Sequence, residues 1–194
     1  MKELLKQTLN AVVCSRYPTM SSESQLMLES ILVRKELIKG ERLINEGEIS
    51  RHFVLVAKGM IRQFYFKNGK DVTEHFSYEG CIMMCIESLF RQTPSRLIAE
   101  AIEPSIVYLL PIDKLHNLMD ASKDINVFYQ RILEYSLITS QEKADSWRFE
   151  TAKERYKRLL KTYPEVIKRA PLSHIASYLL MTPETLSRVR SGVL

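Results

Sequence analysis

The feature that most constrains this chain is a long segment without helix-breaking residues. Residues 122–163 contain neither glycine nor proline, and their apolar side chains recur at helical spacing. A helix of that length exceeds the average in globular proteins, so its apolar faces need more than one neighbour to cover them. We predict a helix that starts after Ser122, and we expect it to bend or break within residues 146–151.

Short strand-like runs precede this helix. Residues 52–57 are β-branched and apolar, and residues 60–66 alternate between apolar and polar side chains. Asn68 and Gly69 follow, and both tolerate the positive φ of a type I′ turn. Residues 71–76 should therefore return as the second strand of a hairpin.

Two further strand-like segments and three short helices complete the predicted N-terminal part. Residues 97–102 and 105–110 are separated by Pro104, which cannot continue a strand ladder. Helical spacing in residues 4–37 predicts two short helices before the strands, and residues 112–119 predict another after them. Several short strands with flanking helices indicate an α+β fold built on a jelly-roll β-barrel.

The C-terminal residues 173–190 have the pattern of two short helices joined by a turn. Ser173 is placed to cap the first helix, and Thr182 is placed to cap the second, with Pro183 at its first position. A small side chain in the first helix lets the two helices cross closely. The predicted inward-facing residues are Ile175, Ala176, Leu179, Leu186 and Val189. We therefore predict a helix-turn-helix.

The second helix of this motif carries donors and acceptors on its outer face. The predicted DNA-binding residues are Ser173, His174, Thr182, Pro183, Glu184, Thr185, Ser187, Arg188 and Arg190. Arginine can make a bidentate contact to guanine, a carboxylate can accept from the cytosine amino group, and hydroxyls can bind phosphates. The alternative interpretation is a capped helical hairpin with a polar outer face and no nucleic-acid partner.

The charge of the chain is unevenly distributed. The net charge is +5, but residues 1–142 carry 17 basic and 18 acidic side chains, whereas residues 143–194 carry 11 and 5. A basic segment attracts polyanions, of which nucleic acid is the commonest. The distribution favours double-stranded DNA as a partner, with a solvated basic helix as the alternative.

The long helix has two apolar stripes, which gives it two surfaces to bury. Phe128, Ile132, Tyr135 and Thr139 continue a 3,4 spacing that starts at Ile125, and a second stripe lies beside them. One stripe can cover the barrel and the other a symmetry mate. We predict a homodimer through Phe128, Ile132, Tyr135 and Thr139, and the alternative is a monomer with a thick core.

The whole chain resembles the Crp/Fnr superfamily of bacterial transcription regulators. The matching segments, in family order, are residues 53–59, 61–69, 76–80 and 175–188. The resemblance implies a cyclic-nucleotide-binding-type sensor barrel in residues 1–121, a dimerisation helix and linker in residues 122–150, and a DNA-binding helix-turn-helix in residues 151–194.

The resemblance also assigns roles and shows two departures from the family pattern. Glu184 and Arg188 fall on the base-contacting positions of the family. Leu180 stands where the family's turn usually has glycine, so the turn must accommodate a side chain or be strained. Residues 163–171 leave little room for the family's β-hairpin wing, so we expect a reduced or absent wing.

A small-molecule effector in the barrel is a further implication of the resemblance. The stretch that corresponds to the family's cyclic-AMP contacts contains the predicted effector residues Glu87, Ser88, Ser95 and Arg96. The phosphate-binding arginine of the family falls at Ser95, and side-chain alternation would point Arg96 away from the pocket. Without that guanidinium a buried phosphate loses a charge-assisted contact, so cyclic AMP is not expected and the effector is unidentified.

Other chemistries lack their sequence signatures. The three cysteines are fewer than an iron–sulfur cluster needs, and lone histidines are usually polar or packing residues. We therefore assign no metal and no certain cofactor. No Walker loop, nucleophile elbow or metal-protease helix is visible, so we predict that the chain is not an enzyme.

Compartment and partners complete the sequence-based expectations. No apolar run reaches the roughly 18 to 20 residues of a membrane helix, and the N-terminus lacks a signal peptide, so we expect a cytoplasmic protein without a membrane partner. The predicted function is a dimeric, sequence-specific DNA-binding regulator that touches RNA polymerase. The alternatives are a small-molecule-binding module without DNA binding and a regulator that acts through protein contacts alone.

Overall fold

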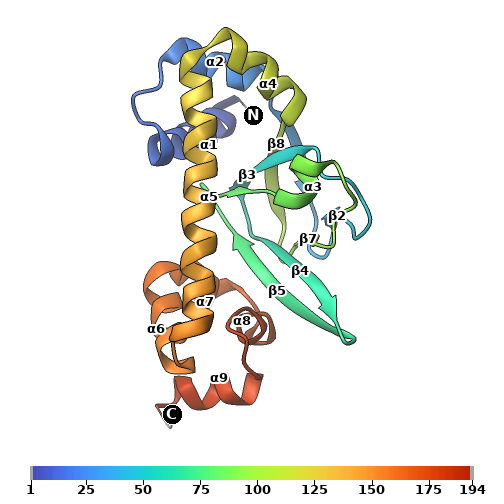
Figure 1. The fold of residues 1–194 in the computed structure, drawn as a ribbon, viewed down its shortest axis with the longest axis vertical. Coiled ribbons are helices and arrows are strands. Elements are labelled where there is room, and N and C mark those ends of the chain that lie inside the picture. The colour runs from blue at the N-terminus through green and yellow to red at the C-terminus, as the bar shows by residue number, and fades with distance from the viewer. Residues whose placement is uncertain (1, 193–194) are drawn as a thin grey trace. The chain divides into compact units, whose positions relative to one another are not determined.

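The computed structural model describes residues 2–192 and forms two compact units. The first unit contains the residues up to Arg62 together with Ser77–Tyr135, and the second contains Gln63–Phe76 and the residues from Ser136 on. The elements, most of which are labelled in Figure 1, are α1 (Lys2–Arg16), α2 (Ser22–Ile31), β1 (Val33–Leu37), β2 (Arg42–Ile44), β3 (His52–Lys58), β4 (Ile61–Lys67), β5 (Lys70–Ser77), β6 (Ile82–Met83), α3 (Ile86–Arg91), β7 (Ile98–Ala101), β8 (Ser105–Pro111), α4 (Ile112–Ala121), α5 (Lys123–Phe149), α6 (Ala152–Thr162), α7 (Pro164–Arg169), α8 (Leu172–Tyr178) and α9 (Pro183–Arg190).

The strands form two four-stranded sheets, ordered β1-β8-β3-β6 and β2-β7-β4-β5. In the first sheet β8 pairs antiparallel with two neighbours, so that Leu109 lies opposite Val33 on one side and Val54 on the other. This arrangement confirms the predicted α+β fold with a jelly-roll barrel.

Strand β3 is buried on both faces, which fixes the position of the core. Phe53 and Leu55 pack with side chains of α1, α2, α4 and the first half of α5, whereas Val54 and Val56 point into the interior of the barrel. Successive side chains of a strand alternate between faces, so a continuous apolar run is what a strand covered on both sides requires.

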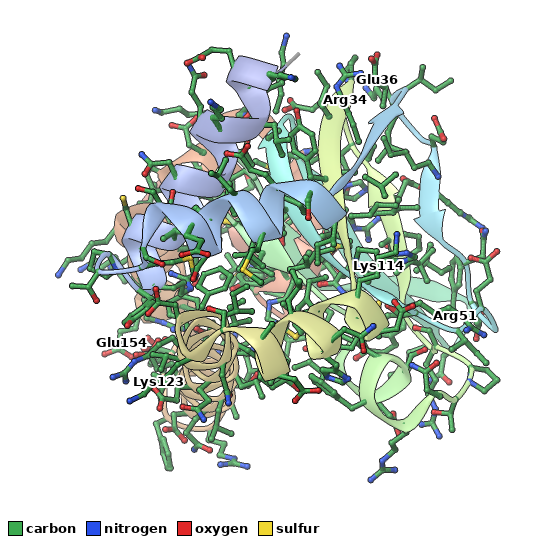
Figure 2. All side chains as sticks on the ribbon, turned by 90° about the horizontal axis from the view of Figure 1, so that it is seen from above. Arg34, Glu36, Arg51, Lys114, Lys123 and Glu154 are labelled. Atoms are coloured by element: carbon green, nitrogen blue, oxygen red, sulfur yellow. The ribbon has the colours of Figure 1, made fainter. Side chains whose placement is uncertain are left out.

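One predicted helix boundary is wrong. The helical spacing was expected to run to Leu37, but α2 ends at Ile31 and Val33–Leu37 form strand β1. Pairing with β8 outweighs the local pattern, because five residues in a ladder satisfy their backbone groups without a helix. Arg34 and Glu36, two residues apart on this strand, form an ion pair on one of its faces (Figure 2).

The predicted break in the long helix is confirmed. Helix α5 ends at Phe149 and α6 begins at Ala152, with Thr151 as its N-cap. The Thr151 hydroxyl accepts from the Glu154 backbone N–H at 3.3 Å, and the Glu154 carboxylate accepts from the Thr151 backbone N–H at 2.8 Å. This capping box starts a new helix and thereby ends the old one.

The second unit joins the β4–β5 hairpin to the C-terminal helices. Asn68 and Gly69 have φ of 52° and 73°, as the predicted type I′ turn requires. Lys143 of α5 is buried and pairs with Glu74 of β5 at 2.7 Å. Burial lowers the pKa of Lys143, and the Glu74 carboxylate opposes that shift.

The described residues after Phe149 form helices and no strand, so no β-hairpin wing is present among them. Separately, no helix within residues 2–192 combines the length and apolar character that crossing a membrane requires.

Gly59, between β3 and β4, provides a test of the barrel's packing. A Cβ there would lie 2.2 Å from the Ser105 hydroxyl and 2.7 Å from the Pro104 carbonyl oxygen, and the backbone φ is +91°. We expect Gly59→Ala to lower the free energy of unfolding by about 3 kcal/mol or more, because steric overlap adds to backbone strain.

The matched control for this substitution is Gly47→Ala. Gly47 has φ of +87° but nothing within 4 Å of the added Cβ, so only the backbone strain of about 1 kcal/mol applies. Urea denaturation of both variants measures the difference, and equal losses of stability would contradict this account of the packing at Gly59.

Candidate nucleic-acid interface

The two helices of the C-terminal motif pack through a small apolar interface. Ile175 and Ala176 of α8 are buried, as are Leu186 and Val189 of α9. Leu179, at the end of α8, is also buried, so all the predicted inward-facing residues of the motif face inward. Helix α6 packs against α9 as well and covers its apolar side.

Helix α9 begins as the sequence predicts. Thr182 is the N-cap, its hydroxyl accepts from the Thr185 backbone N–H at 3.2 Å, and Pro183 occupies the first helical position. A hydrogen bond from its own backbone N–H and one from the Thr182 hydroxyl, with the charge of Arg188, hold the pKa of Glu184 below its ordinary value. Glu184 is therefore ionised at neutral pH and can only accept hydrogen bonds.

The predicted cap of α8 is wrong. The backbone N–H groups of His174 and Ile175 both donate to the Pro171 carbonyl oxygen, at 3.0 and 3.1 Å, so the helix begins at Leu172. Pro171 is the N-cap residue, and Ser173 lies one residue inside the helix with its side chain exposed.

The outward face of α9 agrees with the prediction for most residues. Thr182, Pro183, Glu184, Ser187, Arg188 and Arg190 are exposed, whereas Thr185 and His174 are half-buried. This face therefore presents one carboxylate, two guanidinium groups and two hydroxyls to solvent. These are the groups that can bind base edges and phosphates.

The turn between the helices is a Schellman motif with a strained residue. The Met181 N–H donates to the Ala176 carbonyl at 3.0 Å and the Leu180 N–H donates to the Ser177 carbonyl at 3.1 Å. Leu180 has φ of +52°, the left-handed region that favours glycine. The departure at Leu180 is thus accommodated with backbone strain.

Sequence reasoning missed two residues that fasten this motif. The Ser177 hydroxyl accepts from the Thr73 backbone N–H at 2.7 Å and donates to the Asp71 carbonyl at 3.2 Å. Arg155 of α6 donates to the Leu179 carbonyl at 2.9 Å. A small polar residue in a helix and a cation in a basic stretch carry no spacing signal that would have singled them out.

The predicted effector residues make separate local contacts. Glu87 and Arg96 are exposed, and Glu87 pairs with Arg91 at 3.2 Å. Ser88 is buried, but its hydroxyl accepts from the Ser50 N–H and donates to the Thr93 carbonyl. The Ser95 hydroxyl is likewise bonded to the backbone of Leu97.

Ser95 is buried and Arg96 is exposed, but both lie in the irregular segment before β7, so the expected strand alternation does not apply to them. The barrel interior is packed by apolar side chains, among them Leu37, Val56, Ile61, Ala101 and Val107. The four predicted effector residues therefore offer no gathered donors for a phosphate.

The predicted dimer seam is wrong in its first half. Phe128 and Ile132 are 1% and 2% exposed and pack in the chain's own core, so they cannot reach a partner in this conformation. The Arg16 guanidinium carbon lies 3.5 Å from the centre of the Tyr135 ring. Thr139 lines a cavity of about 530 Å³. The first half of the predicted seam instead packs against the chain's own barrel.

Part of the chain is similar in sequence to a known protein family. Residues 34–122 match the family described as cyclic nucleotide-binding domain. No curated protein matches the chain in sequence.

Several solved structures share the fold over most of their length. FixK2 from Bradyrhizobium japonicum aligns with a TM-score of 0.68 and 21% identity over 84% of each chain. The catabolite activator protein of Thermus thermophilus aligns with a TM-score of 0.58 and 19% identity, over 94% of this chain and 86% of that one. The c-di-GMP-responsive regulator CLP from Xanthomonas campestris aligns with a TM-score of 0.67 and 13% identity, over 89% of this chain and 91% of that one.

Residues 34–122 therefore resemble the cyclic nucleotide-binding domain family. The fold that the sequence resemblance predicts is confirmed, and at these identities the likeness to solved structures establishes a shared fold.

Leu180 offers a test of the strained turn. We expect Leu180→Gly to stabilise the chain by about 1 kcal/mol relative to Leu180→Ala, because glycine adopts a positive φ without strain. Both variants lose the same exposed side chain, so thermal denaturation of the pair isolates the backbone effect. Equal stability of the two variants would mean that Leu180 stores no strain.

Proposed function

We propose that this chain is a homodimeric, sequence-specific DNA-binding transcription regulator. The observation that carries the proposal is the outer face of α9, where Glu184, Arg188 and Arg190 are exposed above a closely packed apolar interface. An ionised carboxylate and guanidinium groups on a short helix are suited to base edges in the major groove.

Two further observations support this proposal. The basic excess of the chain lies in residues 143–194, which contain the helix-turn-helix. The fold is shared by the catabolite activator protein, an activator by its name, and by CLP, which is described as a global regulator. A regulator bound to DNA would act by contacting or excluding RNA polymerase in the cytoplasm.

A different face of α5 supports the dimer. Ile138 and Phe149 are 58% and 80% exposed, although each is a large apolar side chain, and a separation of 11 residues, about three turns, puts them on the same side of the helix. Exposed apolar side chains grouped on one helix mark an interaction surface, and a symmetric partner is the simplest occupant. We place the dimer contact on this face of the helix.

The separation of the predicted effector residues bears on which ligand the barrel can bind. The dispersed effector residues argue against cyclic AMP, so we propose that any effector is a small molecule of another class. An effector can shift the regulator only if it binds one arrangement of the dimer more tightly than another.

Arg188→Ala tests the reading of base edges. We expect affinity for a duplex that the wild-type chain binds selectively to fall by about 1–3 kcal/mol, with relaxed preference at one base pair, because a bidentate contact to guanine is lost. Fluorescence anisotropy measures both quantities. The control is Arg148→Ala, which removes an exposed arginine of α5, outside the helix-turn-helix.

Two outcomes of these binding measurements distinguish the candidate functions. Unchanged sequence preference in Arg188→Ala would contradict direct reading by α9. A wild-type chain that binds no duplex even at low salt would instead favour a small-molecule-binding module or a regulator that acts through protein contacts.

Ile138→Glu tests the dimer. We expect this variant to be monomeric at concentrations where the wild-type chain is dimeric, since a carboxylate in an apolar interface must be desolvated without a partner. Size-exclusion chromatography with light scattering measures the mass. The control, Ser140→Glu, adds the same charge at a nearby exposed position, and dissociation of both variants would contradict the assignment of the face.

A further inference from the structure

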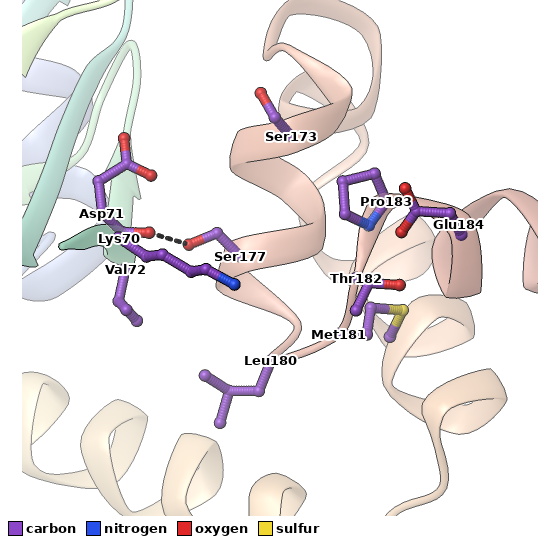
Figure 3. Close-up of a pocket in the computed structure, with 10 residues that line it drawn as sticks. All are labelled: Lys70, Asp71, Val72, Ser173, Ser177, Leu180, Met181, Thr182, Pro183 and Glu184. Atoms are coloured by element: carbon purple, nitrogen blue, oxygen red, sulfur yellow. Dashed lines mark hydrogen bonds between the residues drawn. The ribbon is translucent and has the colours of Figure 1, made fainter. Parts of the chain in front are cut away.

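An open groove of about 780 Å³ lies in the second unit between the β4–β5 hairpin and the helix-turn-helix (Figure 3). Lys70 and Val72 of β5 line one wall, and Ser173, Thr182 and Glu184 line the other. The groove therefore opens beside the first turn of α9, where the proposed DNA-binding face begins.

The hairpin is fastened to the helix-turn-helix. Strand β5 is the last strand of its sheet, so its outer edge has backbone groups that need partners. Ser177 satisfies two of them, at Asp71 and Thr73, and Figure 3 marks the bond to Asp71. The ring of Tyr178 also packs against Phe76, with 5.6 Å between ring centres. The hairpin and the helix-turn-helix thus belong to the same compact unit.

The hairpin carries two cations, of which Lys70 lines this groove. Lys67 and Lys70 flank the Asn68-Gly69 turn, and both are exposed. Within residues 2–192, the Lys70 side chain takes part in no hydrogen bond or ion pair, and it extends toward α8 beside Ser177 (Figure 3). The carboxylates of Asp71 and Glu184 also line the groove, but Lys70 is paired with neither, so its ammonium group is available to a phosphate next to the proposed DNA-binding helix.

A hairpin in this position could either cover the binding face or extend it. A cover would fill the groove and bury the polar groups of α9, but the groove is open, and Glu184, Arg188 and Arg190 remain exposed. The two lysines also attract the polyanion that a cover would have to exclude.

We infer that the β4–β5 hairpin is a second DNA-contacting element, in which Lys67 and Lys70 bind backbone phosphates beside α9. This inference rests on the proposed function. It assigns to the barrel's own hairpin a share of the affinity, whereas α9 supplies the sequence preference.

The experiment compares Lys67→Gln/Lys70→Gln with the wild-type chain over a series of salt concentrations. Affinity should fall several-fold for every duplex sequence, and the slope of log K against log salt should become shallower by about one for each lysine that contacts a phosphate. The control pair, Lys39→Gln/Lys114→Gln, removes the same charge from exposed lysines of the first unit, one of them labelled in Figure 2, and should keep the wild-type slope.

Ser177→Ala tests whether the hairpin must be anchored. This variant keeps both lysines but removes the two bonds to β5, so the slope should become shallower in the same direction. Circular dichroism confirms that each variant is folded. A wild-type slope in Ser177→Ala would overturn the need for anchoring.

The possible outcomes separate the inference from the function on which it rests. If the wild-type chain binds no duplex, both the proposed function and the inference are wrong. If it binds and the double lysine variant keeps the wild-type slope, the inference alone is overturned. Tighter binding by the lysine variant would also overturn it and would identify the hairpin as a cover.

Discussion

The apolar contact between α8 and α9 is the interaction on which the proposed function depends. Ala176 is small and completely buried, and it lets Leu186 approach closely enough to be completely buried in turn. Because the apolar side of α9 is consumed in this contact, its polar side must face solvent. The outward direction of Glu184 and Arg188 is therefore a consequence of core packing, and it needs no bound partner.

The second dependence is the anchoring of this motif on an edge strand. Edge strands expose unpaired backbone groups, and natural proteins cover them. Here Ser177 covers part of β5, while Lys143 binds Glu74 of the same strand. Burial followed by the charge of Lys143 lowers the pKa of the neighbouring His75 to about 3, so His75 stays neutral at physiological pH. The strand that continues from the barrel thus contacts both the long helix and the helix-turn-helix.

Local signals in the sequence predicted the turns and helix ends that are fixed by neighbouring residues. The Asn68-Gly69 turn, the Thr182 cap with Pro183 and the break before Thr151 each depend on neighbouring residues, so the sequence carries them directly. The assignments that failed depend on distant contacts. Phe128 and Ile132 fit a dimer seam by spacing, but spacing cannot tell a partner chain from the chain's own barrel. For the same reason the attachment of Ser177 to β5 could not be predicted.

The central claim is that two copies of α9 read one duplex. Selection of binding sites from a pool of random duplexes by the wild-type chain tests it most directly. The account predicts an enriched, twofold-symmetric motif whose half-sites lie about 10 base pairs apart, centre to centre, which is one turn of B-DNA. Enrichment of no sequence, or of a single half-site without a symmetric partner, would contradict it.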